Sequence, residues 1–359
     1  MTSGEDLTFI SQKGTLRSAF ARFGPDLPRL VSPPAMARAV QLGDEWKGLQ
    51  VRLPSSNAKD HTAYGLLETE ISTALTLQRA YGTTSFRSLF PVLVGYDMHA
   101  EEPYAIYAGP RGRPISSHTQ GVSTGEQLTI ERDLVLAVGL MEAVGLVHRG
   151  IMPAAVRWDG QRIQLWNLGS STRARRPRDP WGVSPFASPE QRAGTGETDP
   201  RDALWSVGQV MHQLVTGRPG SPDGPTALLS SHRSLEQTLG GVFRPRATDR
   251  PTVDELLELL HPGTQVRSLA PGVTDGLEPH RREFDEAMRR KHAALPGPTA
   301  PPPDPYSAVP MEYLPDISPA APVALEYEPR TPRKQRRHWF VGGSTSTRDT
   351  DSREGGQHR

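Results

Sequence analysis

Few side chains in this chain have the type and the placement that proton transfer requires. His148 can serve as a general base, and Asp159 and Asp179 are the nearest carboxylates in loops. The chain contains no cysteine, which excludes disulfides, iron–sulfur clusters, thiolate zinc sites and a cysteine nucleophile. Any enzymatic hypothesis therefore starts from these three residues.

A second group of side chains could accept phosphoryl groups. Ser170, Ser171 and Thr172 stand beside four arginines within residues 170–178. If another kinase phosphorylated them, Arg–phosphate pairs could order this segment. The alternative is a mobile basic loop that stays solvated. Thr331 is a further candidate phosphoacceptor, and it would suit a phosphothreonine-binding partner.

The elements that would position these residues follow from apolar patterning. In chain order the patterns predict strands at 37–42, 49–53, 91–96 and 104–108, an amphipathic helix around 66–77 after the second strand, and helices at 128–146, 204–216, 253–260 and 279–294. A strand-rich front followed by a helical back indicates an α+β fold with two lobes.

Composition predicts that part of the chain stays outside any core. Its 34 glycines and 35 prolines make up about a fifth of the 359 residues. Twelve prolines fall between residues 296 and 332, and a basic cluster and a polar end follow, so residues 295–359 are expected to be a disordered tail. The stretch from Arg333 to Phe340 could touch an anionic membrane, and a solvated linker is the alternative.

The net charge of +1 excludes a globally basic nucleic-acid binder. Neither a signal peptide nor an apolar run long enough to span a bilayer is present in the sequence, so the chain is expected to be cytoplasmic.

The runs around His148 and Asn167 resemble the catalytic and metal-binding loops of protein kinases, in particular bacterial Ser/Thr kinases. Five further motifs in register support this resemblance: Ser188-Pro189-Glu190, Leu204 to Gly208, Leu214 to Pro219, Asp249 to Thr252 with Glu255 to Leu257, and the segment from Asp44 to Leu53 with Glu70 after it.

The resemblance implies a two-lobed protein kinase-like fold, with a small β-rich N-lobe carrying one αC-type helix and a larger helical C-lobe. The expected organisation is an N-terminal extension at 1–24, a kinase-like domain at 25–262 with lobes at about 25–108 and 109–262, a linker at 263–294 and the tail.

The positions that do chemistry in that family have changed. Gly150 stands where the catalytic aspartate belongs, Met152 where the loop lysine belongs, and Ala155 and Asn167 where the two metal ligands belong. Arg52 replaces the lysine that holds the phosphates, and Glu70 could still pair with it. Residues 31–37, where the phosphate-cradling loop is expected, contain no glycine.

Positions that organise the fold in the family are kept. They are His148, Arg149, Gly169, Glu190 and Arg250, and the last two are expected to form a buried ion pair. The family's aspartate at the start of the helix near 204 falls on Ala203, with Asp202 one place earlier, so that either the register slips or the anchor is lost.

The resemblance therefore indicates a pseudokinase without phosphoryl transfer, acting as a regulatory or scaffold partner of an active kinase or phosphatase. No metal site is predicted, and ATP with Mg²⁺ is not an expected cofactor. Two alternatives stay open. One is a divergent kinase or other ATP-using transferase in which Arg52, Glu70, Asn167 and a displaced carboxylate, Asp159 or Asp179, do the chemistry. The other is a sensor whose cleft binds a different small molecule.

Overall fold

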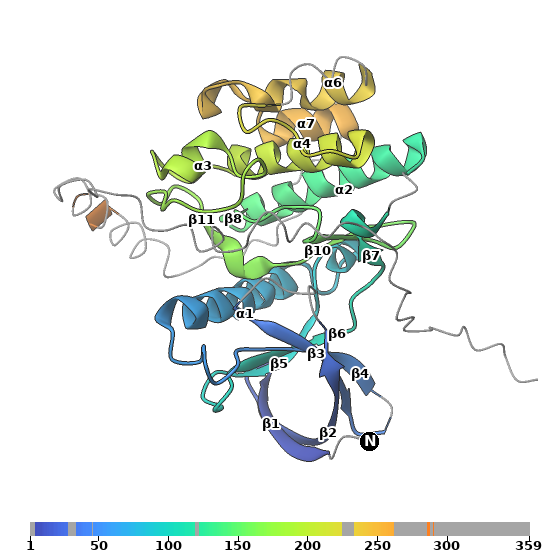
Figure 1. Cartoon of the computed structure of the whole chain (residues 1–359), viewed down its shortest axis with the longest axis vertical. Helices are drawn as coiled ribbons and strands as arrows, with labels where there is room; N and C mark the ends of the chain where they lie inside the picture. Colours follow the sequence, from blue (N-terminus) through green and yellow to red (C-terminus); the bar gives the residue numbers. More distant parts are fainter. Residues whose placement is uncertain are drawn as a thin grey trace, which may run out of the picture. The chain divides into compact units, whose positions relative to one another are not determined.

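A computed structural model describes residues 4–27, 34–44, 46–118, 122–224, 233–261, 286–287 and 290. Within these residues, the N-terminal region forms a closed antiparallel barrel of six strands (Figure 1). Around the barrel the strands follow the order β1 (Glu5–Ser11), β2 (Leu16–Asp26), β3 (Met36–Leu42), β4 (Trp46–Arg52), β6 (Tyr104–Ala108) and β5 (Leu93–Asp97).

The barrel closes because alternating side chains of its first strands point inward. Leu7 and Phe9 on β1 and Ala21 and Phe23 on β2 are buried, whereas the residues between them are more exposed. β1 then pairs with β5 through Ser11 and its neighbour, and this pairing joins the two ends of the sheet. Gly95 permits the closure, since a Cβ at that position would overlap the ring of Phe9.

Helix α1 (His61–Tyr81) follows the fourth strand and packs against β5 and β6. It begins at Asp60, whose carboxylate accepts hydrogen bonds from the first-turn N–H groups. Its buried face includes Leu67, Ile71 and Leu77, and the Tyr81 hydroxyl donates to the carbonyl of Leu140 at 2.8 Å. The helix is therefore fixed to the part of the chain that follows the barrel.

The rest of the described chain mixes helices with short strands. The two small sheets are β10 (Ile163–Leu165), β9 (Val156–Trp158) and β7 (Arg113–Pro114), and β11 (Ser171–Arg173) with β8 (Leu146–His148). The helices are α2 (Thr124–Ala143), α3 (Pro189–Ala193), α4 (Pro200–Thr216), α6 (Arg233–Leu239) and α7 (Val253–Leu260). Short 3-10 helices are η1 (Ser85–Leu89), η2 (Ile115–Ser117), η3 (Leu168–Ser170), η4 (Gly240–Phe243) and η5 (Ala247–Asp249).

The two-lobed kinase-like fold expected from the sequence is contradicted by this architecture. A closed barrel stands where a small β-rich lobe was expected, and it includes two strands, β1 and most of β2, within residues expected to be an N-terminal extension. After the barrel the chain interleaves helices with two small sheets and 3-10 turns, so the described part does not form the larger helical lobe. The physical cause is that the early strands carry enough inward apolar residues to close a sheet on itself.

Several expectations lie outside the described residues. They are the disordered tail at 295–359 with Thr331 and the stretch from Arg333 to Phe340, most of the linker at 263–294, and part of the loop at 31–37. Among the helices that the structure describes, none has the length and apolar character needed to cross a membrane.

Candidate functional site

His148 ends strand β8 and uses both of its ring nitrogens inside the protein. Nδ1 accepts the backbone N–H of Gly150 at 3.1 Å, which places the ring proton on Nε2, and Nε2 donates to the carbonyl of Trp166 at 3.0 Å. The side chain is buried, and desolvation lowers the pKa of His148 to about 4. A neutral imidazole with both nitrogens engaged supports the loop and is not placed to act as a base.

The space beside Gly150 is filled by two other residues. A Cβ added at Gly150 would overlap the hydroxyl of Ser170 and would lie 3.2 Å from the side-chain nitrogen of Asn167. The Ser170 hydroxyl is held there because it donates to the carbonyl of Asn167 at 3.0 Å. The structure thus brings Gly150, Asn167 and Ser170 together, and an aspartate at residue 150 would have to displace the Ser170 hydroxyl.

Asn167 starts the short helix η3 in a left-handed backbone conformation, with φ at 67°. Two residues later, the backbone N–H of Gly169 donates to the carboxylate of Glu70 on α1. Gly169 lies close to α1, since a Cβ there would be 2.8 Å from the carbonyl of Leu66. This contact joins the Asn167 loop to α1.

Glu70 is half-buried, with its carboxyl group turned toward Gly169 and the buried hydroxyl of Tyr107. Desolvation raises the pKa of Glu70 to about 7, against the opposing effects of the Gly169 N–H and Tyr107. Burial, together with the neighbouring carboxylate, raises the pKa of Tyr107 well above its usual value. The Glu70 carboxyl group therefore takes up a proton at higher pH than an exposed glutamate does.

Arg52 does not contact Glu70. At the end of β4 it pairs with Glu102, and its other terminal nitrogen lies 3.2 Å from both oxygens of Asp26. Glu102 also accepts hydrogen bonds from the backbone and hydroxyl of Ser55. Two carboxylates thus pair with the guanidinium of Arg52, and Arg38 is a second cation near them. The pair expected between Arg52 and Glu70 is absent from the described structure.

Met152 and Ala155 lie in the connection between β8 and β9. Ala155 is buried, and its carbonyl accepts the N–H of Trp166 at 2.8 Å. A methyl group at Ala155 offers no metal ligand, and a thioether at Met152 is a poor one for a hard cation. Over the residues that the structure describes, no three His, Asp or Glu side chains gather closely enough to hold a metal ion.

The hydroxyl segment is ordered and partly inaccessible. Ser171 begins β11, which pairs with β8 opposite His148. Ser170 and Ser171 are buried and Thr172 is half-buried, so a kinase would have to displace β11 to reach the two serines. Strand pairing at Ser171–Arg173 and the burial of Arg178 define the two ends of residues 170–178, and whether the segment between them is mobile stays a prediction.

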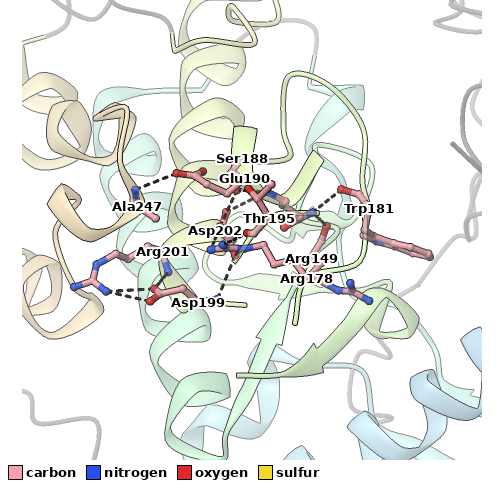
Figure 2. A network of polar contacts seen from close by, with 12 residues as sticks. Arg149, Arg178, Trp181, Ser188, Glu190, Thr195, Asp199, Arg201, Asp202 and Ala247 are labelled. Atoms are coloured by element: carbon pink, nitrogen blue, oxygen red, sulfur yellow. Dashed lines mark hydrogen bonds and ion pairs between the residues drawn. The ribbon is translucent and has the colours of Figure 1, made fainter. Parts of the chain in front are cut away.

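Arg178 and Asp202 form the centre of a buried polar network (Figure 2). The guanidinium donates through Nε at 2.9 Å and through a terminal nitrogen at 3.1 Å to the two carboxylate oxygens of Asp202. The Ser188 hydroxyl donates to the same carboxylate at 2.7 Å. This bidentate pair fixes the segment that precedes α3 to the first turn of α4.

Sequence reasoning missed the partner of this arginine. A carboxylate anchor at the start of α4 is present at Asp202 and not at Ala203, which agrees with a register slip and not with loss. The available signal was Asp199 followed three residues later by Asp202, a capping-box spacing in front of an apolar helix.

Arg149 links the same network to the Ser170 loop. Its Nε donates to the carbonyl of Ser170 at 3.2 Å, and its own carbonyl accepts the side-chain amide of Gln191 at 2.9 Å. The guanidinium also lies 5.2 Å from the ring centre of Trp181 (Figure 2). Arg149 therefore has a structural position, as its family resemblance implied.

The ion pair expected between Glu190 and Arg250 is present. One terminal nitrogen of Arg250 lies 2.9 Å from each carboxylate oxygen of Glu190, and the arginine side chain is fully buried. The guanidinium also stacks 4.8 Å from the ring centre of Trp205. A backbone N–H at Ala247 completes the carboxylate's partners at 3.0 Å. The pair ties α3 to the loop before α7.

The two candidate replacement bases are not brought to Gly150 by any contact in the described structure. Asp159 pairs with Arg111 and accepts two backbone N–H groups of its own turn, and these interactions lower its pKa. Asp179 is exposed. Neither Asp159 nor Asp179 is therefore linked to the His148 loop by a contact among the described residues.

No protein-family model matches the chain. It is 30% identical, over 174 residues that cover 43% of this chain, to the serine/threonine-protein kinase PksC of Streptomyces coelicolor. The match spans 30% of the length of that kinase. The chain thus has a kinase-like relationship over part of its length.

Proposed function

We propose that this chain is a pseudokinase, a protein related to the kinases that transfers no phosphoryl group and acts as a regulatory or scaffold partner of an active kinase or phosphatase. The observation that carries the proposal is the packing of Ser170 and Asn167 against Gly150. Phosphoryl transfer depends on positioning and on charge neutralisation, and a base at this position is part of the positioning.

The surroundings also do not suit Mg²⁺ with ATP. Asn167 turns a side-chain nitrogen toward Gly150, and Ala155 has no ligand atom. Arg52 is already engaged by two carboxylates, with which a triphosphate would have to compete. We therefore include in the proposal that ATP with Mg²⁺ is not a working cofactor of the chain.

The proposed binding role is supported by the contacts of residues 170–178, which form without any phosphorylated side chain. Kinase activation loops are commonly ordered when a phosphate pairs with arginines. Here the carboxylate of Asp202 holds Arg178, and β11 pairs with β8, so the segment has a fixed path with unmodified side chains. Contacts that do not involve a phosphate thus define a surface for a partner.

Label transfer from ATP to the chain itself and to a general protein substrate tests the first half of the proposal. Purified full-length protein with Mg²⁺ or Mn²⁺ is expected to show no transfer above a sample without protein. The matched variants Asn167→Ala and Arg52→Ala identify the source of any signal. Transfer that either variant abolishes would overturn the proposal and support a divergent transferase.

Site-specific photo-crosslinking tests the second half. A photoreactive residue at Asp179, which is exposed on the segment, is expected to capture a kinase or phosphatase in the cells that make this protein, and the same residue at the exposed Glu258 on α7 serves as the control. The isolated partner's activity is then expected to change at least twofold when the chain is added. An unchanged activity would contradict the regulatory role.

A further inference from the structure

A cavity of about 350 Å³ lies away from the residues discussed so far. Helix α2 supplies most of its wall, and η1, the turn between β9 and β10 and the end of α7 supply the rest. Phe86 and Leu136 give it an apolar side. Arg132, Arg162 and His261 give it a side of nitrogen donors, with one carboxylate, Asp133. No residue around Gly150 lines it.

The hydrogen bond between Arg132 and His261 fixes which atoms are donors. A terminal nitrogen of Arg132 lies 3.1 Å from Nδ1 of His261. Because a guanidinium only donates, Nδ1 must accept, and the ring proton then sits on Nε2. Both His261 Nε2 and Arg132 Nε are buried and have no acceptor among the described residues. Buried donors without an acceptor are rare and costly in folded proteins.

The charges of the cavity favour an anion. Asp133 is committed to Arg162, whose Nε donates to it at 2.9 Å, and to the backbone N–H of Ile163 at 3.2 Å. One carboxylate therefore faces two guanidiniums, and the remaining positive charge belongs to Arg132. The terminal nitrogens of Arg162 make no hydrogen bond to any residue in the described part of the chain.

We propose that this cavity binds a small phosphate monoester, with its oxygens on Arg132, Arg162 and His261 and its carbon portion against Phe86 and Leu136. A phosphate dianion brings three acceptor oxygens to three donor side chains, whereas a carboxylate brings two. The volume is at the small end of ligand pockets, which suits one ring or a short carbon chain. The proposal does not depend on the absence of phosphoryl transfer at Gly150.

His261 provides an internal reporter of such a ligand. Its pKa is lowered, first by burial and then by Arg132, while Asp133 raises it and Arg162 lowers it. These are the charged groups that face the imidazole. A bound dianion next to the ring would oppose both arginines and therefore raise the pKa of His261.

Calorimetric titration of the full chain tests the site with phenyl phosphate, inorganic phosphate and phenol as probes. Phenyl phosphate is expected to bind saturably, inorganic phosphate at least fivefold more weakly, and phenol not measurably. Arg132→Gln, which leaves the Asp133–Arg162 pair intact, is expected to lower the affinity for phenyl phosphate at least tenfold. The matched control Arg113→Gln, on β7 and outside the cavity, should bind within twofold of the parent.

A second measurement covers the case in which Arg132→Gln folds poorly. Nuclear magnetic resonance titration of the unaltered chain, with the His261 signal assigned by His261→Gln, is expected to show its pKa rise by at least half a unit with phenyl phosphate. Absence of saturable binding, equal affinity for inorganic phosphate, or an unmoved His261 pKa would each overturn the proposal.

Discussion

The hydroxyl of Ser170 occupies the place where any side chain at residue 150 would have to begin. The two positions lie just beyond the same end of the β8–β11 pairing, and the Ser170 hydroxyl donates to the carbonyl of Asn167. A side chain at residue 150 would therefore have to displace the Ser170 hydroxyl from this hydrogen bond.

The first prediction concerns that packing. Gly150→Asp is expected to lower the free energy of unfolding by about 1–3 kcal/mol, because overpacking forces the neighbours to move. Urea unfolding measures it, and Gly125→Asp, in open space in the first turn of α2, is the neutral control. In a double-mutant cycle with Ser170→Gly the two effects should couple by at least 0.5 kcal/mol. Strict additivity would contradict the contact.

The second prediction concerns the Glu190–Arg250 pair. Glu190→Ala leaves a fully buried guanidinium without its carboxylate, so the free energy of unfolding should fall by roughly 3–5 kcal/mol. Glu258→Ala, at an exposed position on α7, should change it by less than about 0.5 kcal/mol. Equal effects of the two substitutions in urea unfolding would show that the pair contributes little.

The third prediction concerns Asp202. Asp202→Asn removes the charge that holds Arg178 and is expected to speed amide hydrogen exchange through residues 174–199. Asp199→Asn at the same helix start is the matched control, because asparagine still caps a helix and the Asp199–Arg201 pair is partly exposed. Unchanged exchange in the first variant would mean that strand pairing alone orders the segment.

The fourth prediction concerns Glu131, which is buried on α2 and accepts the hydroxyl of Thr238. Desolvation raises its pKa from 4.5 to about 7. The folded state therefore holds a proton that the unfolded state releases between these values, and the stability present below pH 4.5 is lost as the pH rises through 7.

The loss attributable to Glu131 is roughly 3 kcal/mol at most between pH 4.5 and 8. Glu131→Gln should remove this part of the pH dependence. Subtracting the urea-unfolding profile of the variant from that of the parent isolates it, since Glu70 and His148 titrate in both proteins. If the stability of the parent and of Glu131→Gln changed with pH in the same way, the Glu131 carboxyl group would be hydrated and its pKa would not be raised.

The sequence predicted local elements better than their assembly. The strand expected at 37–42 is β3 at Met36–Leu42, the helix expected at 253–260 is α7, and the one expected at 204–216 begins only four residues earlier as α4. The helix expected at 128–146 ends at Ala143 because Gly145 adopts a positive φ and strand β8 follows. Each of these elements carries a clear apolar period.

The barrel was not predicted because the alternation of apolar and polar residues is weak in the sequence of its first strands. On β2, exposed Arg22 separates buried Ala21 and Phe23, but exposed Leu16 and Phe20 on the opposite face weaken the alternation of apolar and polar residues. In the candidate site, the order of the motifs along the chain predicted that the His148 and Asn167 loops lie together and that Glu190 pairs with Arg250. The partners of Arg52 could not be predicted, since Asp26 lies at the end of β2 and Glu102 in the loop before β6, and the strand order of the sheet brings them together.

Closure of the barrel also sets an order of events for a chain made from its N-terminus. β1 meets β5 only after about 85 further residues have been synthesised, and until then the edge of β1 is unpaired. An unpaired edge is a template for association with other chains. Ribosome-bound chains that stop before Tyr104 should therefore be the most aggregation-prone, because β6 must still fill the place between β4 and β5.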